Sequence, residues 1–186
     1  RHEKRFKLSS LDKNARMRTY EEAFFWLADA RIANICYAAS EPSVGLSLSM
    51  EQTALKCYMA DTGLLVTLAF SDNNDTDEDV YRAVLRGDIG LNEGMLTENY
   101  VAQQLSAIGY PLHYWTRDNR AEIDFVVERQ GCVSAIEIKA GENARSRSLS
   151  SLKKSHPGVR LIRLSTKPFG MNDGLRSIPL YAAFCL

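Results

Sequence analysis

The chain has 186 residues, of which 45% are apolar and 25% are charged, and its formal net charge is zero. This composition is typical of a soluble globular protein, and a zero net charge excludes a general attraction to nucleic acid, so any basic surface must be local. No run approaches 18 apolar residues and the N-terminus has no apolar signal segment, which predicts a protein without a membrane span. The cysteines lack CxxC spacing, which argues against a zinc site or a disulfide framework and fits a cytoplasmic location: Cys36, Cys57, Cys132 and Cys185.

Residues 1–62 predict a partial winged-helix-like segment. The first 18 residues are basic and are more typical of a solvated tail than of an arm that contacts phosphates. A helix is expected over Tyr20–Arg31 with Thr19 as its N-cap, followed by strands over Ile32–Ala38 and Ala54–Met59. Because the exposed positions of this helix are mostly acidic, we expect the segment to pack or to oligomerise rather than to read DNA.

Helices are expected next on both sides of an acidic loop. Residues 63–70 read as a short apolar helix, Ser71–Asp79 as a solvated loop, and Leu91–Ile108 as a helix with apolar residues at helical spacing. Glu98 lies near the middle of that apolar stripe. A lone charge on a buried helix face is costly unless it is paired or bound to a metal, so Glu98 either reaches the edge of the stripe or points at the sheet.

A β-hairpin is predicted over Ala121–Lys139. Apolar and polar residues alternate on both sides of a turn at Gln130-Gly131. A two-residue turn pairs Arg129 with Cys132. Counting back from that pair places polar residues opposite each other on one face of the hairpin, Asp124 with Glu137 and Glu122 with Lys139.

The two carboxylates of this hairpin predict a cation site. Directly paired side chains lie so close that two carboxylates repel each other unless one takes up a proton or a cation lies between them. Asp124 and Glu137 beside Lys139 therefore indicate a divalent-metal site. The same pattern also fits the solvated face of a sheet with a plain ion pair between Glu122 and Lys139.

The remaining elements complete an α/β fold with a mixed central sheet flanked by helices, and they make residues 63–186 a second domain. A strand is expected before the hairpin, over Leu112–Thr116. After the hairpin we expect a helix over Ser146–Lys154 and a strand over Val159–Leu164, then a loop over Thr166–Ser177 and an apolar tail over Ile178–Leu186.

Basic residues are placed to form a rim beside the carboxylates. Such a rim would draw an anionic backbone towards an anionic site, although an ordinary solvated helix face explains it equally well. The rim residues are Arg117, Arg120, Arg145, Arg147, Lys153 and Lys154.

A helix bearing Glu98, a strand bearing Asp124 and a neighbouring strand bearing Glu137-Ile138-Lys139 resemble the PD-(D/E)XK nuclease superfamily, including its resolvase-like branch. Ile123 stands where the proline of that motif would be. The surrounding stretches are similar to the C-terminal domain of predicted AAA+ superfamily ATPases of bacteria and archaea: Leu96–Val101, Tyr114-Trp115, Ala121–Val126 and Ile136–Gly141, with further likeness at Asp61–Leu64 and Ile178–Tyr181.

The resemblance implies a restriction-endonuclease-like core that hydrolyses DNA with Mg²⁺ or Mn²⁺. The metal would be held by Asp124, Glu137 and the carbonyl of Ile138, with Glu98 completing the shell directly or through water. Lys139 would position the attacking water or stabilise the developing charge.

The resemblance also implies an ATPase domain upstream in the same polypeptide, because the chain contains no G-x-x-x-x-G-K-[ST] motif and ATP would bind only there. The missing initiator Met likewise suggests an excised fragment. Two alternatives stay open: a nuclease fold retained as a DNA-binding, protein-binding or regulatory module without catalysis, and an interaction or oligomerisation domain whose acidic cluster is only a surface.

Overall fold

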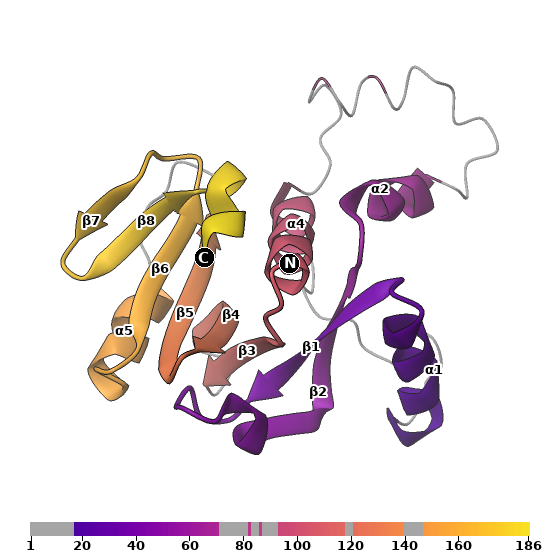
Figure 1. Cartoon of the computed structure of the whole chain (residues 1–186), viewed down its shortest axis with the longest axis horizontal. Helices are drawn as coiled ribbons and strands as arrows, with labels where there is room; N and C mark the ends of the chain where they lie inside the picture. The colour runs from indigo at the N-terminus through magenta and orange to yellow at the C-terminus, as the bar shows by residue number, and fades with distance from the viewer. Residues whose placement is uncertain (1–16, 71–81, 83–85, 87–92, 118–120, 140–146) are drawn as a thin grey trace.

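A computed structural model describes residues 17–70, 82, 86, 93–117, 121–139 and 147–186. It confirms the α/β class, with one mixed sheet of eight strands flanked by helices (Figure 1). The strands are β1 (Ala33–Ala39), β2 (Met50–Met59), β3 (Leu112–Arg117), β4 (Ala121–Arg129), β5 (Cys132–Lys139), β6 (Arg160–Ser165), β7 (Gly170–Asn172) and β8 (Leu175–Pro179). The helices are α1 (Met17–Asp29), α2 (Thr62–Phe70), α4 (Glu93–Ala107) and α5 (Arg147–Ser155), with 3-10 turns η2 (Leu46–Ser49) and η3 (Leu180–Cys185).

The strand order across the sheet is β2-β1-β3-β4-β5-β6-β8-β7. β1 runs parallel to β3, β5 to β6 and β6 to β8, whereas the other neighbouring pairs are antiparallel. The sheet therefore joins the N-terminal strands to the C-terminal ones through the β1–β3 pair.

The N-terminal segment has the expected order of helix, strand, loop and strand. Its strands are not separate, because β1 and β2 form one end of the common sheet. α1 begins at Met17, so Thr19 lies inside the helix and the prediction that it is the N-cap is wrong. The basic residues 1–16 and the acidic stretch 71–79 lie outside the described residues.

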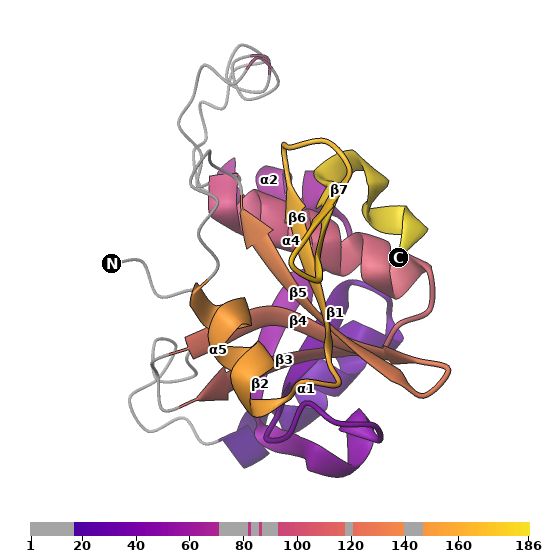
Figure 2. The same cartoon turned by 90° about the vertical axis from the view of Figure 1, so that its left-hand side faces the viewer.

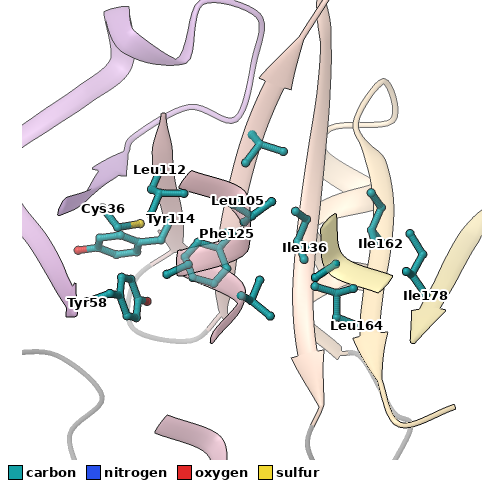
Figure 3. Packing of buried hydrophobic residues seen from close by; sticks show 14 of the residues in the cluster. Cys36, Tyr58, Leu105, Leu112, Tyr114, Phe125, Ile136, Ile162, Leu164 and Ile178 are labelled. Atoms are coloured by element: carbon teal, nitrogen blue, oxygen red, sulfur yellow. The ribbon is translucent and has the colours of Figure 1, made fainter. Parts of the chain in front are cut away.

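An apolar cluster lies under each of α4 and α5, the two helices that can be followed beside the sheet in Figures 1 and 2. The cluster under α4 includes Leu105 with Phe125 and Ile136 from the hairpin, and Figure 3 shows Tyr58 and Phe125 side by side within it. The cluster under α5 includes Leu149, Leu152 and Val126. Each helix thus buries one apolar stripe against one face, as the sequence pattern predicted.

The loop expected over Thr166–Ser177 is instead a hairpin. β7 and β8 pair antiparallel around Asp173 and Gly174, whose φ angles are 47° and 73°. Two successive positive φ angles define the tight turn whose twist matches paired strands, and Asp-Gly is a favoured sequence for it. The strand was missed because the three residues of β7 are all exposed and carry no apolar alternation.

No helix among the described residues is long and apolar enough to cross a membrane.

Candidate carboxylate–lysine site

The hairpin register agrees with the prediction up to the edge of the site. Arg129 pairs with Cys132 across a turn in which Gln130 and Gly131 both have positive φ, and the pairing continues to Phe125 and Ile136. Beyond that pair the ladder of β4 and β5 ends. Asp124 and Glu137 come next in the two strands, and both are buried, with 6% and 5% exposure.

Asp124 lies where the β4–β5 ladder has ended and the β3–β4 ladder is irregular. Its Oδ2 accepts a hydrogen bond of 2.8 Å from the N–H of Ile138 on β5. Towards β3, the register shifts by one residue between the Val126 and Ile123 pairs, which is a β-bulge. As a result Ile123 packs in the cluster under α5, whereas Phe125 packs under α4. The strict alternation of apolar and polar residues predicted for this strand is therefore wrong between Ile123 and Phe125, where the bulge lies and where Asp124 stands.

Glu137 and Lys139 form an ion pair along one strand. The Lys139 Nζ lies 2.8 Å from Oε1 of Glu137, and the lysine side chain is 31% exposed. Glu122, for which a pair with Lys139 was one of the alternatives, lies 2.9 Å from Nζ of Lys56. Within the described part of the chain, the buried Oε2 of Glu137 has no hydrogen-bond partner. A buried carboxylate oxygen without a donor is costly, and a cation would satisfy it.

Glu98 points at the sheet, as expected, and is 5% exposed. Its Oε1 accepts a hydrogen bond from Nζ of Lys56 at 2.8 Å and another from the hydroxyl of Tyr58 at 2.5 Å. Both donors belong to β2, so the partner that a buried Glu98 requires comes from the N-terminal segment and not from the hairpin.

Lys56 is the buried cation of the site. Its side chain is 2% exposed, and its Nζ lies 2.8 Å from Glu98, 2.9 Å from Glu122 and 5.1 Å from the ring centre of Tyr114. Burial lowers the pKa of this ammonium, but the carboxylates of Glu98, Glu122 and Asp124 outweigh that effect and hold the pKa above its usual value. Lys56 is therefore charged at neutral pH.

Two neutral groups surround this ion cluster. Burial and then the nearby Glu98 raise the pKa of the Tyr58 hydroxyl well above its usual value, so it stays protonated and donates to Glu98. Burial likewise raises the pKa of the Cys36 thiol, which makes this thiol unreactive at neutral pH.

Among the described residues, no group of three or more His, Cys, Asp or Glu side chains is arranged to hold a metal ion. Asp124 and Glu137 are the next residues of β4 and β5 beyond the last pair of their ladder, and the N–H of Ile138, which follows Glu137, donates to Asp124. Glu98 is instead bound by Lys56 and Tyr58. Of the carboxylate oxygens of Asp124 and Glu137, Oδ2 of Asp124 accepts from Ile138, whereas the buried Oε2 of Glu137 has no hydrogen-bond partner in the described part of the chain.

The predicted basic rim is partly described. Arg147, Lys153 and Lys154 line an open groove of about 880 Å³ between α5 and β6, together with Arg163. Arg163 is the register partner of Glu137, so the groove adjoins the carboxylates. Lys153 is partly occupied, because its Nζ donates to the carbonyl of Asp173 at 2.7 Å. Of the others, Arg117 is exposed at the end of β3 and does not line the groove, and Arg120 and Arg145 lie outside the described residues.

Sequence reasoning missed Lys56 and Tyr58. The available signal was a lysine in the middle of the apolar stretch Ala54–Met59, which was read only as a strand. A charged residue inside a buried strand requires a partner of opposite charge, and a glutamate on a buried helix face has the same requirement. Considering Lys56 and Glu98 together would therefore have predicted that they pair with each other.

The chain was compared with protein families, curated proteins and solved structures. No curated protein and no solved structure matches it. Residues 1–76 match the family model described as Domain of unknown function (DUF8612). Residues 93–183 match the one described as Domain of unknown function (DUF4143). That second stretch, which includes α4 and the β4–β5 hairpin, is therefore similar to a domain that is typically found in the C-terminal regions of AAA-ATPase-like proteins.

Proposed function

We propose that Asp124, Glu137 and Lys139 form a Mg²⁺- or Mn²⁺-dependent site that hydrolyses phosphodiester bonds in DNA, in a domain attached to an ATPase of the same polypeptide. The observation that carries the proposal is the buried Oε2 of Glu137, which has no hydrogen-bond partner in the described part of the chain and lies where β4 and β5 stop pairing beside Asp124. Carboxylate oxygens are the ligands that Mg²⁺ prefers, so the residues fit the ion.

Each residue of the proposed site has a different role. The N–H of Ile138 fixes the Asp124 carboxylate. Asp124, Glu137 and the carbonyl of Ile138 would hold the metal ion through oxygen. Bound Mg²⁺ would polarise the scissile phosphate and lower the pKa of a coordinated water. Lys139 is anchored by Glu137 yet partly exposed, so its ammonium can reach the phosphate or the attacking water. Glu98 would contribute to the metal site only through water, because its Oε1 already accepts from Lys56 and Tyr58.

The basic groove supports DNA as the substrate. Arg147, Lys153 and Lys154 of α5 and Arg163 of β6 line this groove, and Arg163 is the register partner of Glu137. Because phosphate contacts account for most non-specific affinity for DNA, such a surface would bring a backbone towards the carboxylates. The positive charge of the groove is confined to one surface, as it must be in a chain whose net charge is zero.

Cleavage of linear and branched DNA tests the proposal. The wild-type chain should cleave DNA with Mn²⁺ or Mg²⁺ and lose activity in EDTA. Asp124→Asn, Glu137→Gln and Lys139→Gln should each lower the rate on the order of 100-fold, the usual cost of removing one electrostatic group from a reaction centre. Glu51→Gln, at an exposed carboxylate of β2, is the matched control and should cleave like wild type. Equal activity in all four variants would rule the site out.

A second candidate is a DNA-binding or regulatory module without catalysis. It is favoured by Lys56, whose ammonium already provides a positive charge to Glu98 and Glu122. This candidate predicts DNA binding in EDTA, measured by fluorescence anisotropy, with no cleavage in any divalent metal. Arg147→Gln and Lys154→Gln should weaken that binding and reduce its salt dependence, since each removes one phosphate contact.

A further inference from the structure

A second concave site lies at the turn end of the β4–β5 hairpin. It is a pocket of about 530 Å³ whose walls include Val127, Ile162 and Leu186. This volume falls in the range of small-molecule sites. Arg129 on its rim is five residues from Asp124, which along a strand is roughly 17 Å, so the pocket is separate from the carboxylate–lysine site.

Three arginines from three strands converge on this pocket. Arg129 ends β4, Arg160 begins β6 and Arg176 lies in β8. Each stands two residues from a member of the cluster under α4, namely Val127, Ile162 and Ile178, so all three side chains leave the same face of the sheet.

The three guanidinium groups are available to a ligand. No Asp or Glu side chain lines the pocket, and within the described part of the chain none of the three arginines pairs with a carboxylate. Arg129 is held over the ring of Tyr110, with its Cζ 5.7 Å from the ring centre, which orients its planar group. All three are exposed, so their charges remain solvated until an anion arrives.

The floor of the pocket is mainly apolar. Val127 and Ile162 form part of it, and Ser134, the register partner of Arg160, adds one hydroxyl. Guanidinium groups match phosphate oxygens in geometry and charge, and several of them favour a dianion over a single carboxylate. An apolar floor beneath such a rim favours a ligand with an apolar or aromatic body.

We propose that this pocket binds a small phosphate monoester with an apolar or aromatic body. The phosphate lies among Arg129, Arg160 and Arg176, and the body lies over Val127 and Ile162. The inference does not depend on the proposed function of the carboxylate–lysine site.

Calorimetric titration of the whole chain with three matched probes tests the inference. Phenyl phosphate should bind about tenfold more tightly than inorganic phosphate, and benzyl alcohol, which has the body without the anion, should bind more weakly than phenyl phosphate. Arg160→Gln combined with Arg176→Gln should weaken phenyl phosphate binding at least about tenfold. Arg117→Gln, an exposed arginine of β3 outside the pocket, should bind like wild type.

A site-specific readout accompanies the titration. Cys185 is exposed and lines the pocket, whereas Cys57 is half-buried and does not. Phenyl phosphate should slow the reaction of N-ethylmaleimide with Cys185 and leave that with Cys57 unchanged. The single arginine variants serve if the double variant unfolds. Absence of phenyl phosphate binding, or unchanged binding in folded arginine variants, would overturn the site; equal binding of phenyl and inorganic phosphate would overturn the apolar body.

Discussion

At the scale of single residues, the ammonium of Lys56 compensates the negative charge of the carboxylates beside it. A buried lysine is favourable only when carboxylates compensate for its lost hydration, and here Glu98 and Glu122 both lie within 3 Å of Nζ. Among the charged side chains described at the site, Lys56, Lys139, Glu98, Glu122, Asp124 and Glu137, the formal charge is two units negative. That residual charge is what a divalent cation would neutralise.

Lys56→Met should destabilise the fold by about 3–5 kcal/mol, because it leaves Glu98 buried without its cation. Urea unfolding followed by circular dichroism measures the loss. Adding Glu98→Gln to this variant should recover part of the stability, since it removes the uncompensated charge.

Lys167→Met is the control for this pair, because Lys167 is exposed and should change stability little. A Lys56→Met protein as stable as wild type would show that the ion cluster contributes nothing to the fold.

The Cys36 thiol predicts a loss of stability in alkali. Its folded pKa is raised by burial above its ordinary value of 9.0, so above pH 9 the unfolded chain releases a proton that the folded chain retains. Unfolding free energy should therefore fall as pH rises beyond 9, by up to about 1.4 kcal/mol per pH unit from this group. Cys36→Ala should have a shallower slope between pH 9 and 10, measured by urea unfolding at each pH. An identical slope in both proteins would assign the loss to other groups.

At the scale of elements, α4 connects the two halves of the chain. Beside Glu98, the buried Asn99 side chain accepts from the N–H of Met59 at 2.8 Å and donates to the Met59 carbonyl at 3.1 Å. One turn later, Gln103 accepts from the N–H of Thr62. These amides satisfy backbone groups where β2 ends and α2 begins, so the helix fixes that junction as well as covering the sheet.

Asn99→Ala should cost about 1–3 kcal/mol, because it leaves the backbone groups of Met59 without partners in a part-buried place. Gln104→Ala, at a half-buried position of the same helix, is the matched control and should change stability by much less. Hydrogen exchange at Met59 measures the local effect, and unchanged protection there in Asn99→Ala would contradict the role given to this amide.

Most elements were predictable because their apolar periodicity is strong. The Leu91–Ile108 pattern predicted α4 nearly to its ends, and the Gln130-Gly131 turn predicted the hairpin register. What failed depended on tertiary contacts. The bulge in β4 arises from pairing with β3, and no local pattern marks it. Register alone offered Lys139 as one possible partner of Glu122, whereas Glu122 pairs with Lys56, a lysine that is distant in sequence.

At the scale of the whole molecule, two family matches meet in one sheet. Residues 1–76 and 93–183 match different families, yet β1 pairs with β3 and Lys56 pairs with Glu98 across that division. Sequence reasoning divided the chain at residue 62, because the order of elements before that point is typical of a winged helix. The pairing of β1 with β3 is a long-range contact, and periodicity carries no information about it.

Deleting residues 1–62 should prevent the rest of the chain from folding. The deletion exposes the edge of β3 and leaves Glu98 facing an open apolar surface without Lys56 or Tyr58. Residues 63–186 should lack a cooperative thermal transition and should aggregate, whereas the whole chain should unfold in one step. A fragment that melts cooperatively near the transition of the whole chain would establish the C-terminal part as an independent domain.

The central claim is that Asp124 and Glu137 hold a divalent metal, and isothermal titration of Mg²⁺ and Mn²⁺ into the whole chain tests it most directly. We expect saturable binding in wild type and in Glu51→Gln, and loss of that binding in Asp124→Asn and Glu137→Gln, with all four proteins folded by circular dichroism. Metal binding that persists in both site variants, or its absence from the wild type, would contradict the claim.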